Sequence, residues 1–189
     1  MLLNRIYRKI FEVAERSASS LRIIHLKLKY SGIQVNFGCR IARGCHISCH
    51  DGSTLILENV NVCQNAVIIA GDGGRMEIRN TYIGFGSVLV AVHSIEIRDN
   101  CALGEMVVIR DQDHRFGEGL QLQTSGAEYS PVKLGQNVWV GSKATILRGV
   151  TVGDNAVIGA SAVVTKEVPA GVVAIGIPAR AVKQIGEAG

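Results

Sequence analysis

Hydrophobic residues follow two different spacings along the chain, and the change falls near residue 30. Before that point, large apolar side chains recur every three or four residues, which is the spacing of one face of an α-helix. They are Leu2, Leu3, Ile6, Ile10, Val13, Leu21, Ile24 and Leu28. The segment 2–29 is therefore predicted to be helical, and the serine-rich stretch 17–20 is expected to interrupt the helix.

From about Val35 onward the spacing changes to six, and it is most regular after residue 133. An aliphatic residue starts each hexad, and a small or branched residue follows four positions later. The aliphatic positions are Leu134, Val140, Ile146, Val152, Ile158 and Val164, and the small or branched ones are Val138, Ala144, Val150, Ala156, Ala162 and Val168. A strict period of six is typical of a β-solenoid, in which each short strand forms one side of a coil. Several stacked coils are needed to bury one continuous core.

The same register returns less regularly upstream, where Cys39 and Cys45 occupy two of the small-residue positions. One long interruption, 110–133, separates two regular runs, and a loop of that length in a compact repeat is usually functional. The chain is thus divided into an N-terminal helical extension, 1–30, and a solenoid domain, 31–189. The solenoid domain carries the long loop at 110–133 and a C-terminal tail.

Composition and charge exclude several classes of protein. Aromatic residues make up only 5 % of the 189 residues, which suits a core of small and β-branched side chains and provides few platforms for stacking RNA bases. Residues 1–30 hold seven cations and two anions, a net charge of +5, so the remaining 159 residues sum to about −1. The body therefore offers no broad basic surface for nucleic acid. Five cysteines, and an opening without the apolar core of a signal peptide, lead us to expect a reduced, cytoplasmic setting.

Three blocks near the C-terminus have a more specific meaning. They read Asn-Val-Trp-Val-Gly at 137–141, Gly-Ala-Ser-Ala-Val-Val-Thr-Lys at 159–166 and Gly-Ile-Pro-Ala-Arg at 176–180. Together they resemble the last coils of hexapeptide-repeat acyltransferases, in the branch that contains maltose, galactoside and capsular-polysaccharide O-acetyltransferases. The resemblance spans about residues 35–185. It implies a left-handed parallel β-helix, a homotrimer, acetyl-CoA as the acyl donor and no metal.

His114 opens the long interruption, in the sequence Asp-Gln-Asp-His-Arg at 111–115. A sugar hydroxyl is a poor nucleophile until its proton is removed, and imidazole, with an ordinary pKa of about 6.5, can remove it near neutral pH. A loop histidine among charged residues is often merely solvated, but the resemblance implies that His114 is the general base. A carboxylate on the other ring nitrogen would hold the tautomer, and both Asp111 and Asp113 are candidates.

The resemblance also implies which residues contact acetyl-CoA, in a groove between neighbouring subunits. They are Trp139, Gly141, Ser142, Ala160, Thr165, Lys166, Arg180 and Lys183. Cations in the tail are expected to meet the nucleotide phosphates, and a backbone N–H near Gly141 or Ser142 to stabilise the oxyanion. Without the resemblance, these residues are ordinary turn residues and solvated cations. On the acceptor side the family often carries an asparagine before the base, where this chain supplies Ser87.

These patterns predict an acetyl-CoA-dependent O-acetyltransferase that acts on a sugar or surface-polysaccharide precursor hydroxyl by direct transfer. N-acetylation of an amino sugar is the alternative within enzymes of this kind. A γ-type carbonic anhydrase would need three histidines around one Zn²⁺. A non-catalytic scaffold would need neither a zinc site nor an acetyl-CoA site. The cluster of Cys39, Cys45, His46, Cys49 and His50 suggests a metal, but Cys39 and Cys45 are predicted to be core filler.

Segment 1–30 has two interpretations. It could cap the open end of the solenoid, which would otherwise present unpaired strand edges. It could instead lie on an anionic membrane surface, because its apolar spacing is combined with a net charge of +5. The cap is favoured here, since the expected interruption at 17–20 weakens a continuous membrane-binding face.

Overall fold

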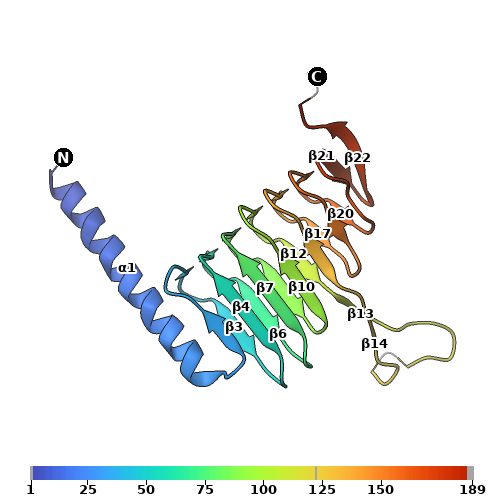
Figure 1. Ribbon diagram of the computed structural model, residues 1–189, viewed down its shortest axis with the longest axis horizontal. Helices are drawn as coiled ribbons and strands as arrows, with labels where there is room; N and C mark the ends of the chain where they lie inside the picture. Colours follow the sequence, from blue (N-terminus) through green and yellow to red (C-terminus); the bar gives the residue numbers. More distant parts are fainter. Residues whose placement is uncertain (1, 122, 187–189) are drawn as a thin grey trace.

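The computed structural model describes residues 2–121 and 123–186 as one long helix followed by a column of short strands (Figure 1). The helix, α1, spans Leu2–Lys29. It meets the first coil only near its C-terminal end, and its N-terminal half projects away from the column. Among the described residues, no helix combines the length and the apolar character needed to cross a membrane.

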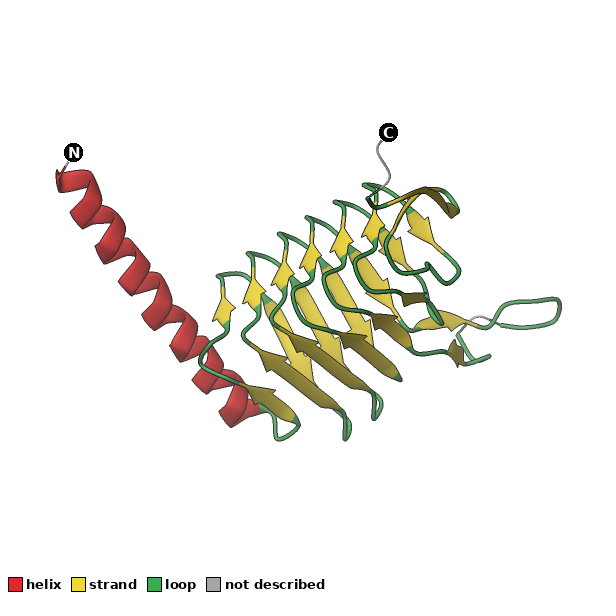
Figure 2. Ribbon diagram, turned by 45° about the horizontal axis from the view of Figure 1, so that its top comes forward, coloured by secondary structure: helices red, strands yellow, loops and turns green. Residues whose placement is uncertain are grey.

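The strands stack into three sheets that form the sides of the column (Figure 2). Sheet A contains β1 (Ile33–Val35), β4 (Thr54–Glu58), β7 (Arg75–Arg79), β10 (Ser94–Ile97), β15 (Val132–Leu134) and β18 (Thr151–Val152). Sheet B contains β2 (Arg40–Ile41), β5 (Asn61–Val62), β8 (Tyr82–Ile83), β11 (Ala102–Leu103), β16 (Trp139–Val140), β19 (Val157–Ile158), β21 (Val172–Gly176) and β22 (Ala179–Gln184). Sheet C contains β3 (His46–Cys49), β6 (Val67–Ala70), β9 (Val88–Ala91), β12 (Val108–Arg110), β17 (Thr145–Ile146) and β20 (Val163–Val164).

Each strand pairs in parallel with the equivalent strand of the next coil, except that β22 folds back antiparallel on β21. The predicted left-handed parallel β-helix with an N-terminal helix is therefore confirmed. The corners of successive coils stack into edges. We call the edge between sheets B and C the B/C edge, and the edge between sheets C and A the C/A edge.

The hexad positions form the core. All twelve aliphatic and small positions between Leu134 and Val168 are at most 5 % exposed. Cys39 and Cys101 fill equivalent positions in other coils, and burial raises the pKa of both thiols. Cys39 is thus core filler, as predicted, whereas Cys45 is only half-buried and its thiol donates to the Cys63 carbonyl at 3.1 Å.

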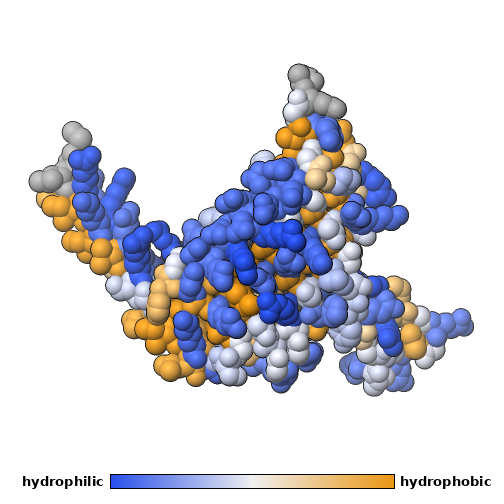
Figure 3. Space-filling model, in the orientation of Figure 1, coloured by the Kyte–Doolittle hydropathy of each residue, from blue (hydrophilic) through white to orange (hydrophobic). Residues whose placement is uncertain are grey.

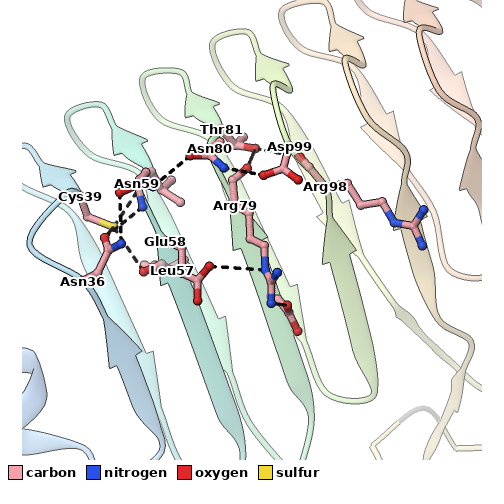
Figure 4. Close-up of polar contacts among 12 residues, drawn as sticks. Asn36, Cys39, Leu57, Glu58, Asn59, Arg79, Asn80, Thr81, Arg98 and Asp99 are labelled. Atoms are coloured by element: carbon pink, nitrogen blue, oxygen red, sulfur yellow. Dashed lines mark hydrogen bonds and ion pairs between the residues drawn. The ribbon is translucent and has the colours of Figure 1, made fainter.

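A column of amides joins the corners between sheets A and B (Figure 4). The Asn36 amide donates to Asn59 at 3.1 Å, Asn59 donates to Asn80 at 3.0 Å, and Asn80 donates to Asp99. Asn59 and Asn80 have φ values of +54° and +42°, and asparagine tolerates this left-handed region better than most residues. The side chains therefore satisfy one another where the backbone turns.

The outer face of sheet A is charged. Arg79 pairs with Glu58 at 3.6 Å across neighbouring strands, and Arg98 pairs with Glu96 at 2.9 Å within one strand (Figure 4 shows the Arg79 pair). Such exposed pairs contribute only about 0.2–1 kcal/mol each, but they keep this face hydrated.

Contrary to expectation, α1 is not interrupted at 17–20. The Ser17 and Ser20 hydroxyls donate to the carbonyls of Val13 and Arg16, at 3.0 and 3.1 Å, so the serines are satisfied inside the helix. The Ser19 hydroxyl accepts the Ile41 N–H at 2.9 Å and thereby ties the helix to the first coil.

Only the last third of α1 covers the end of the solenoid. Ile23, Leu26 and the following Tyr30 are at most 8 % exposed against the first coil. The whole segment 3–17 is exposed. Capping therefore accounts for the C-terminal part of the helix, and its N-terminal half is not buried against any of the residues that the structure describes.

Candidate active site

The long interruption forms a hairpin that leaves the solenoid at the C/A edge, where β12 would otherwise turn into sheet A (Figures 1 and 2). Its two strands, β13 (Gln112–His114) and β14 (Ala127–Tyr129), pair antiparallel. In this register Asp113 lies opposite Glu128, and His114 lies opposite Ala127. The hairpin thus holds His114 at its base, beside the solenoid.

Asp111 anchors the point where the hairpin leaves the coil. Its side chain is fully buried, and its carboxylate accepts the Val92 N–H at 3.1 and 3.2 Å and the His93 N–H at 2.8 Å. Both amides belong to the corner of the preceding coil. Asp111 therefore fixes the position of the hairpin.

Arg148 clamps the hairpin from the next coil. Its guanidinium donates to Asp113 at 2.9 Å and to Glu128 at 2.5 Å, so one cation bridges both carboxylates of the cross-strand pair. Sequence reasoning missed Arg148, because it occupies an ordinary turn position 35 residues after Asp113. Asp113, Glu128 and Arg148 are far apart in the sequence and come into contact only when the coils stack.

His114 is exposed at the base of this clamped hairpin. Within residues 2–121 and 123–186, neither Asp111 nor Asp113 makes a hydrogen bond to it. Both candidate carboxylates are instead occupied, one by backbone amides and the other by Arg148. The imidazole of His114 is left open to an incoming molecule.

Ser87 is not at the surface. It is fully buried, its hydroxyl donates to the Gly104 carbonyl at 3.1 Å, and it accepts the Val107 N–H at 3.2 Å. These bonds tie two successive coils together at the B/C edge. The expected acceptor-side role is therefore corrected, because in this chain the Ser87 hydroxyl is enclosed.

Gly141, Ser142 and Ala160 lie at the B/C edge. The coils approach so closely there that a Cβ on Gly141 would lie 2.6 Å from the Ala160 nitrogen, so only glycine fits. The Gly141 N–H already donates to the Ile158 carbonyl at 2.7 Å. Of the two amides expected at an oxyanion, that of Ser142 alone has no acceptor among the described residues.

The Ser142 side chain adds a charged partner that the sequence did not reveal. Its hydroxyl donates to the Glu105 carboxylate at 2.5 Å, and this hydrogen bond lowers the pKa of Glu105. Trp139 lies beside this edge on the outer face of sheet B and is 57 % exposed. An indole, a carboxylate and a free amide are therefore neighbours here.

The tail brings two cations into one concavity. Lys166 and Arg180 both line a cavity of about 210 Å³, whose walls include Pro169 and Ala179. Thr165 precedes Lys166 at the same exposed corner. Lys183 lies opposite Val173 on β22 and does not line this cavity. The lining of this cavity holds two cations and one carboxylate, that of Glu167. This excess of positive charge suits an anionic group such as a phosphate.

The site residues predicted from the sequence thus fall into two groups within one chain. His114, Thr165 and Lys166 follow the C/A edge, whereas the B/C edge group is formed by Gly141, Ser142 and Ala160. Sheet C separates the two edges. A single chain therefore does not bring all of the predicted residues together.

The histidines do not form a metal centre in this structure. Among the residues described, no three His, Cys, Asp or Glu side chains are grouped so that they could hold a metal ion. His46, His50 and His93 are each exposed on different corners or strands.

Comparisons with known proteins agree with the fold. Residues 131–166 match the family described as bacterial transferase hexapeptide (six repeats). A maltose O-acetyltransferase from Clostridium difficile 630 is 34 % identical, with a TM-score of 0.54 over 82 % of this chain and 67 % of that one. The galactoside O-acetyltransferase of Escherichia coli (strain K12) is 39 % identical over 110 residues, 58 % of this chain and 53 % of the relative. The chain spans about half the length of the curated relatives it matches.

A more distant likeness concerns the fold alone. The N-acyltransferase AntD from Bacillus cereus, solved in complex with dTDP and coenzyme A, is 20 % identical, with a TM-score of 0.70 over 84 % of this chain and 88 % of that one. The fold and its repeats define a hexapeptide β-helix of the transferase class. The chain belongs to the hexapeptide-repeat acyltransferase family, and the resemblance noted in the sequence is confirmed.

Proposed function

We propose that the protein is an acetyl-CoA-dependent O-acetyltransferase that acts on a hydroxyl of a sugar or surface-polysaccharide precursor. The observation that carries this proposal is the placement of His114. Its ring is exposed at the base of a hairpin that Asp111 and Arg148 hold rigidly, on the same edge as Lys166. Family membership supplies the reaction class, and the enzyme is proposed to work in the cytoplasm.

In the proposed reaction, His114 takes the proton of the acceptor hydroxyl as the hydroxyl oxygen attacks the thioester carbonyl. The Ser142 N–H donates to the carbonyl oxygen as negative charge develops there. His114 then returns its proton to the departing sulfur, so that free coenzyme A and the acetyl ester are the products. Lys166 and Arg180 are proposed to hold phosphate groups of the donor.

The separation of the two groups supports a homotrimer with sites between subunits. The middle of sheet C presents an uncharged aliphatic surface, whereas the outer face of sheet A is covered by ion pairs. The outward residues of sheet C there are Val67, Ile69, Val88, Val90 and Val108. If this face packs on another copy, the C/A edge of one chain can meet Trp139 and the B/C edge of its neighbour in one groove.

Transfer to an amino group is the second possibility within the same chemistry. A sugar amine is a better nucleophile than a hydroxyl, and the same histidine could remove its proton after attack. An assay with matched hydroxyl and amino sugars distinguishes O-acetylation from N-acetylation.

The test uses the purified full chain with acetyl-CoA and detects the free thiol released in the presence of matched hydroxyl and amino sugars. We expect thiol release with hydroxyl acceptors, and His114→Ala should lower kcat by about 10²–10⁴-fold with little change in the affinity for acetyl-CoA. His50→Ala, which changes another exposed histidine outside the site, is the control. Activity of His114→Ala within a few-fold of wild type would remove His114 from the role. Turnover of amino sugars alone would assign N-acetylation.

A further inference from the structure

An apolar stripe runs along α1 on the side that faces away from the solenoid, in two stretches at 3–13 and 21–28. Nine large hydrophobic side chains of the helix are 43–84 % exposed. At 100° per residue they all fall within less than half of the helix circumference. They are Leu3, Ile6, Tyr7, Ile10, Phe11, Val13, Leu21, Ile24 and Leu28. Figure 3 shows apolar residues along the outer border of the helix and polar residues along its inner border.

Among the described residues, the buried core contains no member of this stripe, although Phe11, Val13 and Leu21 line clefts between α1 and the solenoid. The residues that cover the first coil, Ser19, Ile23 and Leu26, lie on the opposite side of the helix. The stripe extends along a helix of 28 residues, or about 42 Å at about 1.5 Å per residue. An apolar surface of this length is far more than capping requires, and such exposed patches mark interaction sites.

Charged residues are arranged around the stripe in a specific way. Lys9 and Lys27 border it on one side and Lys29 on the other, as their positions on the helix show. Both acidic residues of the helix, Glu12 and Glu15, instead line a cleft of about 720 Å³ between α1 and sheet B. Both helix carboxylates therefore face this cleft, which Arg16 also lines, whereas lysines border the apolar surface.

We propose that α1 lies along an anionic lipid bilayer, with its apolar stripe in the headgroup boundary and the bordering lysines, Lys9, Lys27 and Lys29, at the level of the lipid phosphates. A high density of cations beside an exposed apolar face, without enough apolar residues to span the bilayer, is the pattern of an interfacial helix. Because the helix is not interrupted at 17–20, the two apolar stretches, 3–13 and 21–28, lie on one face of the same helix.

Charge favours lipid over a second copy of the chain as the occupant. Two copies packed stripe to stripe would bring two segments of net charge +5 together, whereas an anionic surface attracts each of them. The geometry also permits the contact, because the helix forms one border of the molecule and the solenoid lies entirely on its other side (Figures 1 and 3).

The first experiment is co-sedimentation of the full chain with phosphatidylcholine vesicles that do or do not contain phosphatidylglycerol. We expect binding to the anionic vesicles that weakens as salt is added, and much weaker binding to the neutral ones. An absence of binding to anionic vesicles at low salt would overturn the proposal.

Two variants locate the contact. Ile6→Asp combined with Ile10→Asp should weaken binding at least about tenfold, and Lys9→Glu should weaken it by about tenfold on anionic vesicles only. All three side chains are exposed, so thermal unfolding should be unchanged. Ile177→Asp, at an exposed position in the tail, is the matched control. Wild-type binding by the double variant, or a fall in its oligomeric mass instead of its lipid binding, would refute the proposal and assign the stripe to another protein surface.

Discussion

Replacing Asp111 by alanine would remove the acceptor of two backbone amides at the base of the hairpin. The Val92 and His93 N–H groups donate to this buried carboxylate at 2.8–3.2 Å, and the acceptor has no substitute within the described corner. A buried donor left without an acceptor costs about 1–3 kcal/mol. Two such donors predict a loss of about 2–6 kcal/mol in the free energy of unfolding. Asp111→Asn keeps one acceptor oxygen and should lose about half as much.

Urea unfolding at a fixed protein concentration measures the global effect, and amide hydrogen exchange at Val92 and His93 measures the local one. In Asp111→Ala both amides should exchange faster, and the hairpin strands β13 and β14 should lose protection with them. An unfolding free energy within about 1 kcal/mol of wild type, with unchanged exchange, would refute the structural role. A different result, wild-type stability of Asp111→Asn with acyl transfer reduced by more than about 100-fold, would show that Asp111 acts on His114 instead.

Three further substitutions test other parts of the structure. Arg148→Ala should lower thermal stability only slightly, because its ion pairs are partly exposed. It should lower kcat clearly, because the hairpin that carries His114 is released. An equal fall in thermal stability and in kcat would contradict the role of Arg148 as a clamp. Gly141→Ala should destabilise the solenoid by several kcal/mol in thermal unfolding, since its Cβ would overlap the next coil, whereas Gly71→Ala, with no atom within 4 Å, should be nearly neutral. Arg180→Ala should weaken acetyl-CoA binding in calorimetry, and the effect should shrink with dephospho-CoA or high salt; an unchanged Kd would make Arg180 an ordinary surface cation.

The period of six in the sequence is sufficient to predict the solenoid. Each hexad carries its own aliphatic and small residue, and this local order identified the positions between Leu134 and Val168 that stacking of the coils buries. The same holds for a helix at the N-terminus and for the long loop at 110–133 that interrupts the coils. These features follow from residues close in sequence, so periodicity alone could predict them.

The role of each site residue was decided by contacts between coils. Asp111 meets amides 18 and 19 residues earlier, and Arg148 meets Asp113 across 35 residues, so no local pattern distinguishes an anchor from a catalytic carboxylate. Ser87 became internal for the same reason, because its two hydrogen bonds join neighbouring coils.

The orientation of α1 was also a tertiary outcome. Sequence periodicity alone favours turning the apolar stripe toward the solenoid. The open end of the first coil is small, however, and Ile23, Leu26 and Tyr30 suffice to cover it. The helix therefore docks through its opposite side, and its longest apolar surface, from Leu3 to Leu28, faces outward.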